Sequence, residues 1–134
     1  MLKKILYVSA GVILDNNYKI LLSKRKKNKH LPGYWEFPGG KLEMDETPEV
    51  ALKRELKEEL NIETDEACLA PMTFTTFKYE DFYLVMFLFV CRKWSGKIIN
   101  LESDEIIWVS KNRLRQYKMT PANINLISFI EDII

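Results

Sequence analysis

The segment from Gly39 to Ile62, GGKLEMDETPEVALKRELKEELNI, constrains the fold and the chemistry of this chain more than any other. It follows Phe37-Pro38 and opens with two glycines, which permit a tight turn and a close approach of a ligand to the main chain. Thr47-Pro48 then predicts the start of a helix, because threonine is a good N-cap and proline is favoured at the first helical position. The segment therefore predicts a turn that leads directly into a helix.

The predicted helix extends to about Leu60 and separates apolar from acidic residues. Glu55, Glu58 and Glu59 are three and four residues apart, so they lie on one side of the helix, where like charges repel by roughly 0.2–0.5 kcal/mol per pair. One interpretation is a solvated helix face, balanced by neighbouring basic residues. The glycine turn and Glu46 upstream favour another, an oxygen-rich site for Mg²⁺, which binds carboxylates, waters and substrate phosphates together. The residues expected to face the core are Val50, Ala51, Leu52, Leu56 and Leu60.

The same segment resembles the Nudix box, G-x5-E-x7-R-E-U-x-E-E-x-G-U, where U is a bulky aliphatic residue. One position differs, because Asn61 stands where the box has its last glycine. This position is expected to need a left-handed conformation after the helix, and asparagine is the best substitute for glycine there. The resemblance is to the Nudix hydrolases, which cleave nucleoside diphosphates linked to another group. The matching residues are Gly40, Glu46, Arg54, Glu55, Leu56, Glu58, Glu59 and Ile62.

Length and composition are typical of one globular domain spanning residues 1–134, with 47% hydrophobic residues. The 20 basic and 19 acidic residues leave a net charge of +1, which gives no general attraction to nucleic acid polymers or to a membrane surface. The basic start Met1–Lys4 is not followed by a cleavage site, and no apolar run is long enough to span a bilayer. We therefore expect a cytoplasmic protein, and a monomer.

The first part of the chain predicts a β-hairpin. Ile5–Leu14 has a strand pattern, interrupted by Ser9-Ala10-Gly11, and Asp15-Asn16-Asn17 is typical of a turn. Tyr18–Arg25 is then expected to return beside the first strand. Tyr34–Phe37 is a short extended segment that leads into the box.

The second half predicts another antiparallel pair, Cys68–Tyr79 with Phe82–Trp94, and a last short strand, Glu105–Val109. Within the pair, Tyr83–Cys91 is apolar at every position, which is typical of a central buried strand. Strands and helices alternate without a βαβ repeat, so the fold class is α+β. The resemblance implies the Nudix fold, a mixed β-sheet sandwiched between α-helices.

Two helices are expected at the C-terminal end. Ser110 is predicted to cap a short helix, Lys111–Tyr117, and Thr120-Pro121 to open a final one that extends to Ile134. The residues expected to face the core from the final helix are Ile124, Ile127, Phe129 or Ile130, and Ile133.

Three residues outside the box extend the resemblance to the MutT branch of the family, which hydrolyses oxidised purine nucleoside triphosphates. Glu102 precedes Trp108 at the place where MutT-like proteins have an extra carboxylate near the metals. Asn123 matches an asparagine that contacts the purine edge, and Arg25 matches a base-contacting arginine. The alternative interpretation of Glu102 is a solvated acid, and that of Asn123 is a polar residue at a helix start. For Arg25 it is a member of the solvated basic run Lys24–Lys29.

The resemblance implies a role for each residue of the candidate site. The implied metal ligands are the Gly39 carbonyl, Glu55, Glu58, Glu59 and Glu102. The implied substrate contacts are Arg25, Phe37, Gly40, Lys41 and Asn123, with Phe37 packing on the purine and Lys41 touching a phosphate. Glu46 and Arg54 are expected to form a structural ion pair between the loop and the helix.

These residues predict a Mg²⁺-dependent nucleoside triphosphate pyrophosphohydrolase, with Mn²⁺ as a second metal that such ligands accept. The metal would neutralise charge on the phosphates and lower the pKa of the attacking water. Either Glu55 or Glu102 would take the proton of that water, and the sequence does not choose between them. The expected reaction converts 8-oxo-dGTP to 8-oxo-dGMP and pyrophosphate. Removing this damaged nucleotide from the pool before DNA replication prevents mutation.

Two other functions fit the sequence. Pyrimidine triphosphates, nucleotide sugars and dinucleoside polyphosphates are cleaved by enzymes that carry the same box. A non-catalytic nucleotide sensor is the alternative from another class. The presence of all three box acids argues against a sensor, because a protein that only binds a nucleotide has no need for three acids that repel one another. These acids are Glu55, Glu58 and Glu59.

Overall fold

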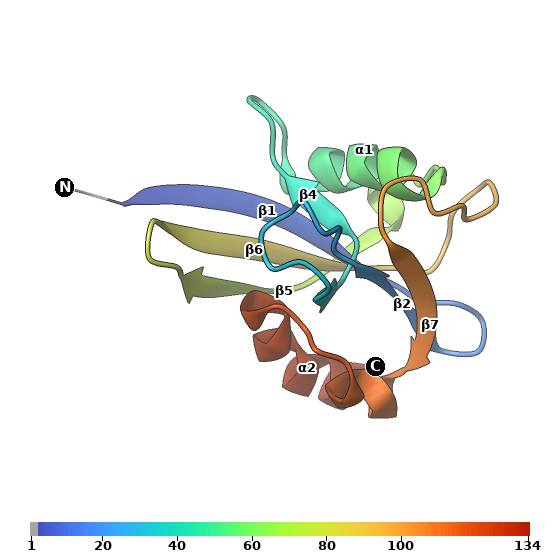
Figure 1. The fold of residues 1–134 in the computed structure, drawn as a ribbon. Helices are drawn as coiled ribbons and strands as arrows, with labels where there is room; N and C mark the ends of the chain where they lie inside the picture. The colour runs from blue at the N-terminus through green and yellow to red at the C-terminus, as the bar shows by residue number, and fades with distance from the viewer. Residues whose placement is uncertain (1–2) are drawn as a thin grey trace.

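The computed structural model describes residues 3–134, so Met1 and Leu2 of the basic start lie outside the described residues. The strands form two sheets rather than one (Figure 1). The first has the order β4 (Gly39–Lys41), β1 (Lys4–Ile13), β6 (Phe82–Cys91) and β5 (Leu69–Lys78). The second has the order β3 (Trp35–Glu36), β2 (Lys19–Lys24) and β7 (Glu105–Ser110). The helical segments are α1 (Pro48–Leu60), η1 (Glu66–Cys68), η2 (Lys111–Gln116) and α2 (Pro121–Ile133).

The first sheet is mixed, because β1 is parallel to β6 but antiparallel to β4. β5 and β6 pair antiparallel, as predicted, and β6 occupies a central position. β1 continues through Ser9, Ala10 and Gly11 without a break, so the predicted interruption is wrong.

The predicted hairpin between the first two strands is also wrong. The turn itself forms, because the Asp15 carbonyl accepts from Tyr18 N and the Asp15 carboxylate accepts from Asn17 N and Lys19 N. Beyond the single bridge between Leu14 and Ile20, however, the two strands separate into different sheets. Both edges of β1 are taken by β4 and β6, so β2 pairs with β3 and β7 instead.

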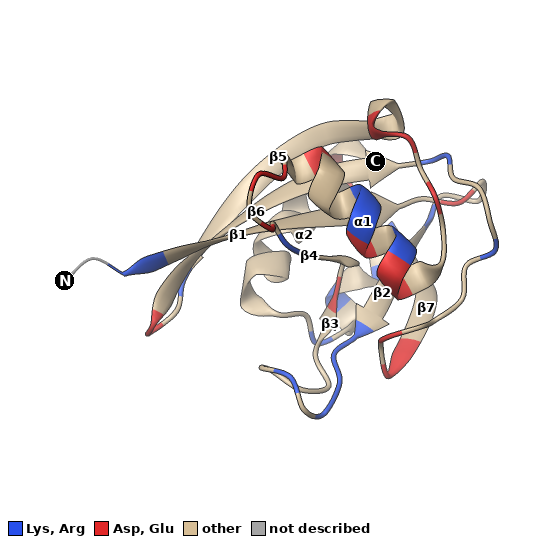
Figure 2. Cartoon of the chain, turned by 90° about the horizontal axis from the view of Figure 1, so that it is seen from above, with Lys and Arg blue, Asp and Glu red and all other residues tan. Residues whose placement is uncertain are grey.

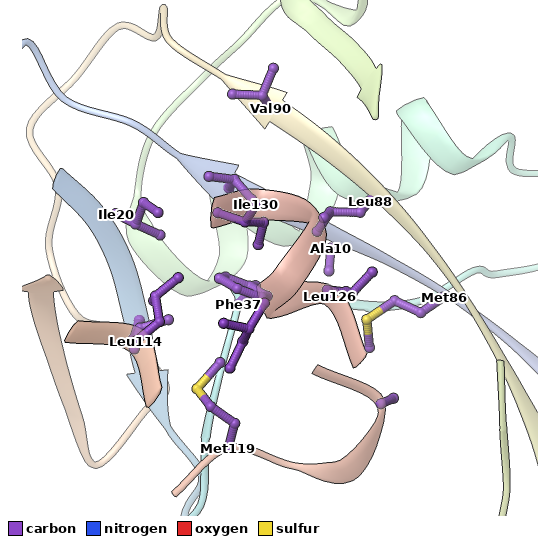
Figure 3. Packing of buried hydrophobic residues seen from close by; sticks show 14 of the residues in the cluster. Ala10, Ile20, Phe37, Met86, Leu88, Val90, Leu114, Met119, Leu126 and Ile130 are labelled. Carbon is purple, nitrogen blue, oxygen red and sulfur yellow. The ribbon is translucent and has the colours of Figure 1, made fainter. Parts of the chain in front are cut away.

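A helix covers each face of the strands, as the predicted sandwich requires. On one face, α1 packs Leu52, Leu56 and Leu60 against Ile13 and Phe89. On the other, the larger cluster joins α2 to alternate residues of β1, β2 and β6, and includes Leu88, Leu126 and Ile130 (Figure 3). The α+β class and the Nudix fold are therefore confirmed. None of the helices within residues 3–134 is long and apolar enough to cross a membrane.

The final helix faces the core with a different side from the predicted one. Ile127 and Ile130 are buried, but Ile124 and Ile133 are exposed, so these two predictions are wrong. Leu126 occupies the core instead. The segment η2 is a 3₁₀ helix, and the Ser110 side chain makes no capping hydrogen bond to it. Nearly every turn of α2 carries apolar residues on several sides, so its sequence pattern alone does not select the buried face.

Helix α1 begins and ends as predicted. The Thr47 hydroxyl accepts from Val50 N at 3.3 Å, and Pro48 is the first helical residue. Asn61 follows the helix with φ 60° and ψ 30°, a left-handed conformation, and its N–H donates to the Lys57 carbonyl at 3.1 Å. Asparagine therefore adopts here the left-handed conformation that was expected at the glycine position of the box.

The left-handed Asn61 gives a stability prediction. Asn61→Val should lower the free energy of unfolding by about 1–2 kcal/mol, because a β-branched residue is strained at positive φ. Asn61→Gly should be neutral or slightly stabilising. Urea unfolding of both variants measures the difference, and a Val variant as stable as the parent would contradict the role of Asn61.

Candidate active site

A pocket of about 700 Å³ lies where α1, β4, β1, β6 and the start of α2 meet. Its acidic end contains Glu55, Glu58 and Glu59 of α1 together with Glu102 from the loop before β7. Its other end has an apolar wall, formed mainly by Leu6, Val8, Leu84 and Met86. The basic segment that follows β2 forms part of the rim, and Figure 2 shows its charged positions together with those of α1. The pocket thus combines an acidic, an apolar and a basic region.

Arg54 donates hydrogen bonds to several groups around the acidic end of the pocket. Its Nε and Nη2 donate to the two carboxylate oxygens of Glu46 at 2.8 and 2.9 Å, and Nη2 also donates to the Lys41 carbonyl at 3.0 Å. Its Nη1 donates to Glu55 Oε1 at 2.8 Å and to Glu58 Oε2 at 3.3 Å. The Arg54 hydrogen bonds hold the pKa of Glu46 down at about 2. The geometry matches the loop-to-helix ion pair expected of Glu46 and Arg54.

Glu59 is an acid of the site whose ionised form is strongly disfavoured. Burial, reinforced by the negative charges of Glu55 and Glu36, raises the pKa of its carboxyl to about 9. Its Oε2 accepts one hydrogen bond, from Gly39 N at 3.3 Å. Burial likewise raises the pKa of Glu55, against the lowering effect of Arg54. The ionised forms of Glu59 and Glu55 are therefore disfavoured where these side chains lie.

The two glycines let the main chain approach other atoms very closely. A Cβ on Gly40 would lie 2.4–2.7 Å from the Glu55 carboxyl group, so the absence of a side chain gives that carboxylate its place. Gly39, at φ +155°, pairs with Ala10 of β1, and a Cβ there would lie 2.0 Å from the Ser9 carbonyl oxygen. The predicted turn is therefore wrong, because Gly39 and Gly40 belong to strand β4, which pairs with β1 and sets the acids of α1 against the edge of the sheet.

Glu102 and Lys41 both line the pocket with exposed side chains. The negative charge of Glu102 contributes to the raised pKa values of Glu55 and Glu59. All four acids that the sequence nominated therefore line one pocket.

Asn123 and Phe37 border the apolar end but are more deeply buried than open contact residues, at 1% and 2% exposure. Asn123 Oδ1 accepts from Phe37 N at 3.2 Å, and its Nδ2 donates to Thr120 Oγ1 at 2.5 Å. These contacts fix the orientation of the amide and leave one N–H and one oxygen lone pair free. The Phe37 ring belongs to the core cluster around α2.

Arg25 lies at the pocket rim in an ion pair. Its Nη1 donates to both oxygens of Glu36, at 2.9 and 2.8 Å, and its Nε donates to the His30 carbonyl at 2.5 Å. Burial raises the pKa of Glu36, although Arg25 opposes the shift. Arg25 is therefore held in place by the protein and does not belong to a freely solvated basic run.

Sequence reasoning missed several residues of the pocket. Glu36 sits beside the box, but nothing in its local pattern distinguishes a pocket acid from a surface acid. The apolar wall of Leu6, Val8, Leu84 and Met86 was assigned only to strands. Thr120 was interpreted as a helix cap, whereas its hydroxyl accepts from Asn123. The spacing of Thr120 and Asn123, three residues apart at a helix start, is that of a capping box and was the available signal.

The donor set suits a hard divalent cation, since it consists of carboxylates and a backbone carbonyl. A cation bound there would favour the ionised form of Glu59, which burial and the neighbouring negative charges disfavour. Within residues 3–134, however, no three acidic, histidine or cysteine groups stand close enough together as placed to form a ligand cluster. The predicted convergence is therefore incomplete, because Arg54 draws Glu55 and Glu58 toward itself.

Fold and site together define a hydrolase of the Nudix type. A model of the NUDIX domain matches residues 6–130. The 8-oxo-dGTP diphosphatase of Haemophilus influenzae is 37% identical over 125 residues, which cover 93% of this chain and 90% of that protein. The CTP pyrophosphohydrolase of Escherichia coli is 33% identical over 132 residues, which cover 87% of this chain and 85% of that protein.

A solved structure agrees. The solution structure of the E. coli ORF135 protein superimposes with a TM-score of 0.85 at 30% identity, covering 98% of this chain and 91% of that chain. This chain belongs to the Nudix hydrolase family. Members of the family act on small nucleotide substrates and generally use divalent metal ions.

The raised pKa of Glu59 predicts that removing its charge stabilises the folded protein, by an amount that grows with pH. Because the folded pKa lies above the ordinary value of 4.5, ionisation of Glu59 costs stability progressively between pH 4.5 and about 9. Glu59→Gln should therefore stabilise the metal-free protein little at pH 5 and clearly at pH 8, by up to about 1.4 kcal/mol for each pH unit. Thermal melts with EDTA measure this, with Glu63→Gln as a matched exposed control. A gain that does not grow with pH would contradict the assignment.

Proposed function

We propose that this Nudix hydrolase is a Mg²⁺-dependent nucleoside triphosphate pyrophosphohydrolase that converts 8-oxo-dGTP to 8-oxo-dGMP and pyrophosphate. The observation that carries the proposal is the single pocket with an acidic end at Glu55, Glu58 and Glu59 and an apolar end next to Asn123. A nucleotide has the same division, since its phosphates need cations and its base needs an apolar slot. The proposed role in the cell is to keep the oxidised nucleotide out of DNA.

The acidic end supplies the residues for hydrolysis. In this proposal the ligands of Mg²⁺ are Glu55, Glu58, Glu59, Glu102 and the Gly39 carbonyl, and Glu58 is exposed enough to turn from Arg54 toward the pocket. The bound ion supplies charge neutralisation and a more acidic water. Glu55 or Glu102 accepts the proton of the attacking water, while Lys41 and the Gly40 backbone contact the phosphates. Arg54 stays paired with Glu46 throughout and keeps the loop and the helix together.

The apolar end supplies the preference for the base. Guanine presents the acceptors O6 and N7, whereas oxidation at C8 gives N7 a proton and makes it a donor. The one free N–H and one free lone pair of the Asn123 amide match an acceptor next to a donor, which is the oxidised edge. The amide is nearly inaccessible as it stands, so the base reaches it by displacing neighbouring side chains such as Phe37 slightly. Arg25, held by Glu36, lies at the rim for a further contact with the base.

The test is kcat/KM for 8-oxo-dGTP and dGTP in the parent and in two Asn123 variants. We expect a strong parent preference for 8-oxo-dGTP, because sites that match polar groups discriminate by up to about 10⁴-fold. Asn123→Ala should lose roughly 2–4 kcal/mol of that preference, mostly on the oxidised nucleotide. Asn123→Asp keeps an acceptor for Phe37 N but loses the donor, so it separates base recognition from support of the fold. Equal losses on both nucleotides would show that Asn123 holds structure only.

A pyrimidine triphosphate is the second candidate substrate. It is favoured by the relative named CTP pyrophosphohydrolase, which matches this chain over most of its length. Including CTP and dCTP in the same series decides between the two, because a kcat/KM for CTP above that for 8-oxo-dGTP reverses the assignment. Pyrophosphate release that is absent with every metal and nucleotide would favour the sensor instead.

A further inference from the structure

The dipeptide Thr-Pro stands at two helix starts, Thr47-Pro48 before α1 and Thr120-Pro121 before α2. Each threonine is the N-cap residue of its helix and has extended backbone angles. Thr47 caps its helix in the usual way, because its Oγ1 accepts from Val50 N at 3.3 Å. In the described part of the chain, the side chain of Thr120 makes no capping hydrogen bond. The two sites thus share a local sequence but use the hydroxyl differently.

The Thr120 hydroxyl binds a side chain instead of the backbone. Its Oγ1 accepts from Asn123 Nδ2 at 2.5 Å, across the same spacing of three residues that separates Thr47 from Val50. A hydrogen bond from the N-cap side chain to the backbone stabilises a helix, and α2 lacks that stabilisation. The hydroxyl therefore fixes the Asn123 amide rather than the start of the helix.

The Asn123 amide is held at both of its polar atoms. Its oxygen accepts from Phe37 N at 3.2 Å, and because a backbone N–H only donates, this contact decides which end of the amide is the oxygen. The nitrogen then faces the Thr120 hydroxyl. Two anchors fix the plane of the amide, whereas the contact with Phe37 alone would let it turn about a single hydrogen bond.

The backbone joins the two anchors to each other. Thr120 N donates to the Trp35 carbonyl at 3.1 Å, and Trp35 N donates to the Lys118 carbonyl at 2.8 Å. These bonds tie the segment that carries Phe37 to the start of α2. The fold therefore sets the position of both anchors, and with them the direction of the free N–H and the free lone pair of Asn123.

Both side chains are buried beside the pocket. Asn123 is 1% exposed and Thr120 is 6% exposed, and both line the pocket. Replacing the Thr120 hydroxyl by a methyl group would leave Asn123 Nδ2 without this partner in a place that solvent hardly reaches. The orientation of the amide thus depends on one hydroxyl group.

We propose that Thr120 is a positioning residue for base selection, whose hydroxyl fixes the orientation in which the Asn123 amide meets the base. The inference rests on the proposed function, in which this amide distinguishes the oxidised edge of 8-oxo-dGTP from that of dGTP. Groups that bind a ligand must be held within about 0.5 Å of the productive geometry by the residues around them. A tilted amide meets the oxidised edge poorly while the acidic end of the pocket is unchanged. The loss therefore falls on binding of the oxidised base and not on the hydrolysis step.

Steady-state kinetics of Thr120→Val and Thr120→Ser with both nucleotides test the proposal. Valine keeps the shape of threonine without the hydroxyl. It should raise KM for 8-oxo-dGTP by about 10- to 100-fold, with kcat and the constants for dGTP changed little. Serine keeps the hydroxyl and should keep the parental preference. Thr47→Val is the matched control, since it removes the hydroxyl of the other Thr-Pro cap and should lower the melting temperature without changing the preference.

NMR of the free protein tests the contact without any substrate. The side-chain amide resonances of Asn123 are those that disappear in Asn123→Asp. Their exchange with solvent should be slow in the parent and in Thr120→Ser, and faster by on the order of 10-fold in Thr120→Val, because one hydrogen bond is lost. Unchanged exchange in Thr120→Val overturns the proposal, since the hydroxyl then does not hold the amide.

The kinetic results can also overturn the proposal. Equal losses on the two nucleotides in Thr120→Val, or a loss that Thr120→Ser shares, would mean that the threonine only supports the fold. A parent that prefers another nucleotide contradicts the proposed substrate instead. The role of Thr120 is then decided by the exchange rates and by the KM of that nucleotide in Thr120→Val, where an unchanged KM overturns it.

Discussion

Glu58→Gln should lower kcat by about 10²-fold or more, which corresponds to roughly 2.7 kcal/mol of lost transition-state stabilisation. The amide keeps the size of the side chain but removes one anionic ligand. This variant is suited to the test, because Glu58 is half exposed and pairs with Arg54 at 3.3 Å. The free energy of unfolding should stay constant or rise slightly, since a repulsion with its neighbouring acids disappears. Single-turnover kinetics at saturating Mg²⁺ measure the effect.

Glu63→Gln is the matched control for this prediction. Glu63 is also exposed and also pairs with one basic residue, Lys57, at 3.4 Å, but it lies outside the pocket. Its kcat should equal that of the parent. Near-parental turnover of Glu58→Gln would remove Glu58 from the proposed metal ligands and leave Glu55 and Glu59 as the main acids.

Features set by neighbouring residues could be predicted from the sequence. The cap at Thr47, the helix from Pro48 to Leu60 and the left-handed Asn61 all depend on contacts within a few residues, and all agree with the structure. The same holds for the Glu46–Arg54 ion pair, since its partners are only one loop and two helical turns apart. The box therefore specifies its helix and the ends of that helix, whereas the strand at Gly39–Lys41 depends on pairing with β1 and was predicted as a turn.

Features set by distant pairing could not be predicted. The hairpin at Asp15 failed because strands far along the chain compete for the edges of β1, and a local pattern does not reveal them. The buried face of α2 failed for a similar reason. Its orientation is fixed by Asn123, which accepts from Phe37 N across 86 residues, so Leu126 turns inward and Ile124 outward.

The acids of the site could be predicted from the sequence, but their burial and their pKa values could not. The sequence nominated Glu55, Glu59 and Glu102, and the structure places all three on one pocket. The raised pKa values of Glu55 and Glu59, by contrast, arise mainly from burial, and that of Glu59 also from the charges of Glu55 and Glu36, which only the fold brings close. Composition and spacing do not contain that information.

Among the 5 glycines of the chain, Gly39 has the least room for a side chain. Its φ of +155° is a conformation that side chains rarely permit, and a Cβ there would meet backbone atoms only: Ser9 O at 2.0 Å, Ala10 Cα at 2.7 Å and Ser9 C at 2.9 Å. The neighbouring Gly40 differs, because its Cβ would meet the flexible end of Glu55. The first contact cannot relax without separating β4 from β1, whereas the second relaxes by moving one carboxylate.

Gly39→Ala should therefore lower the free energy of unfolding by more than about 3 kcal/mol, a large part of the roughly 5–15 kcal/mol that stabilises a typical domain. Gly40→Ala should stay folded but lose activity, since it displaces Glu55. Gly33→Ala is the matched control, because Gly33 has φ +79° with no atom within 4 Å of its Cβ site, so only about 1–2 kcal/mol of backbone strain is expected. Urea unfolding with parallel activity assays measures all three. If Gly39→Ala lowers the free energy of unfolding no more than Gly33→Ala does, β4 is free to move away from β1 and does not fix the acids against the sheet.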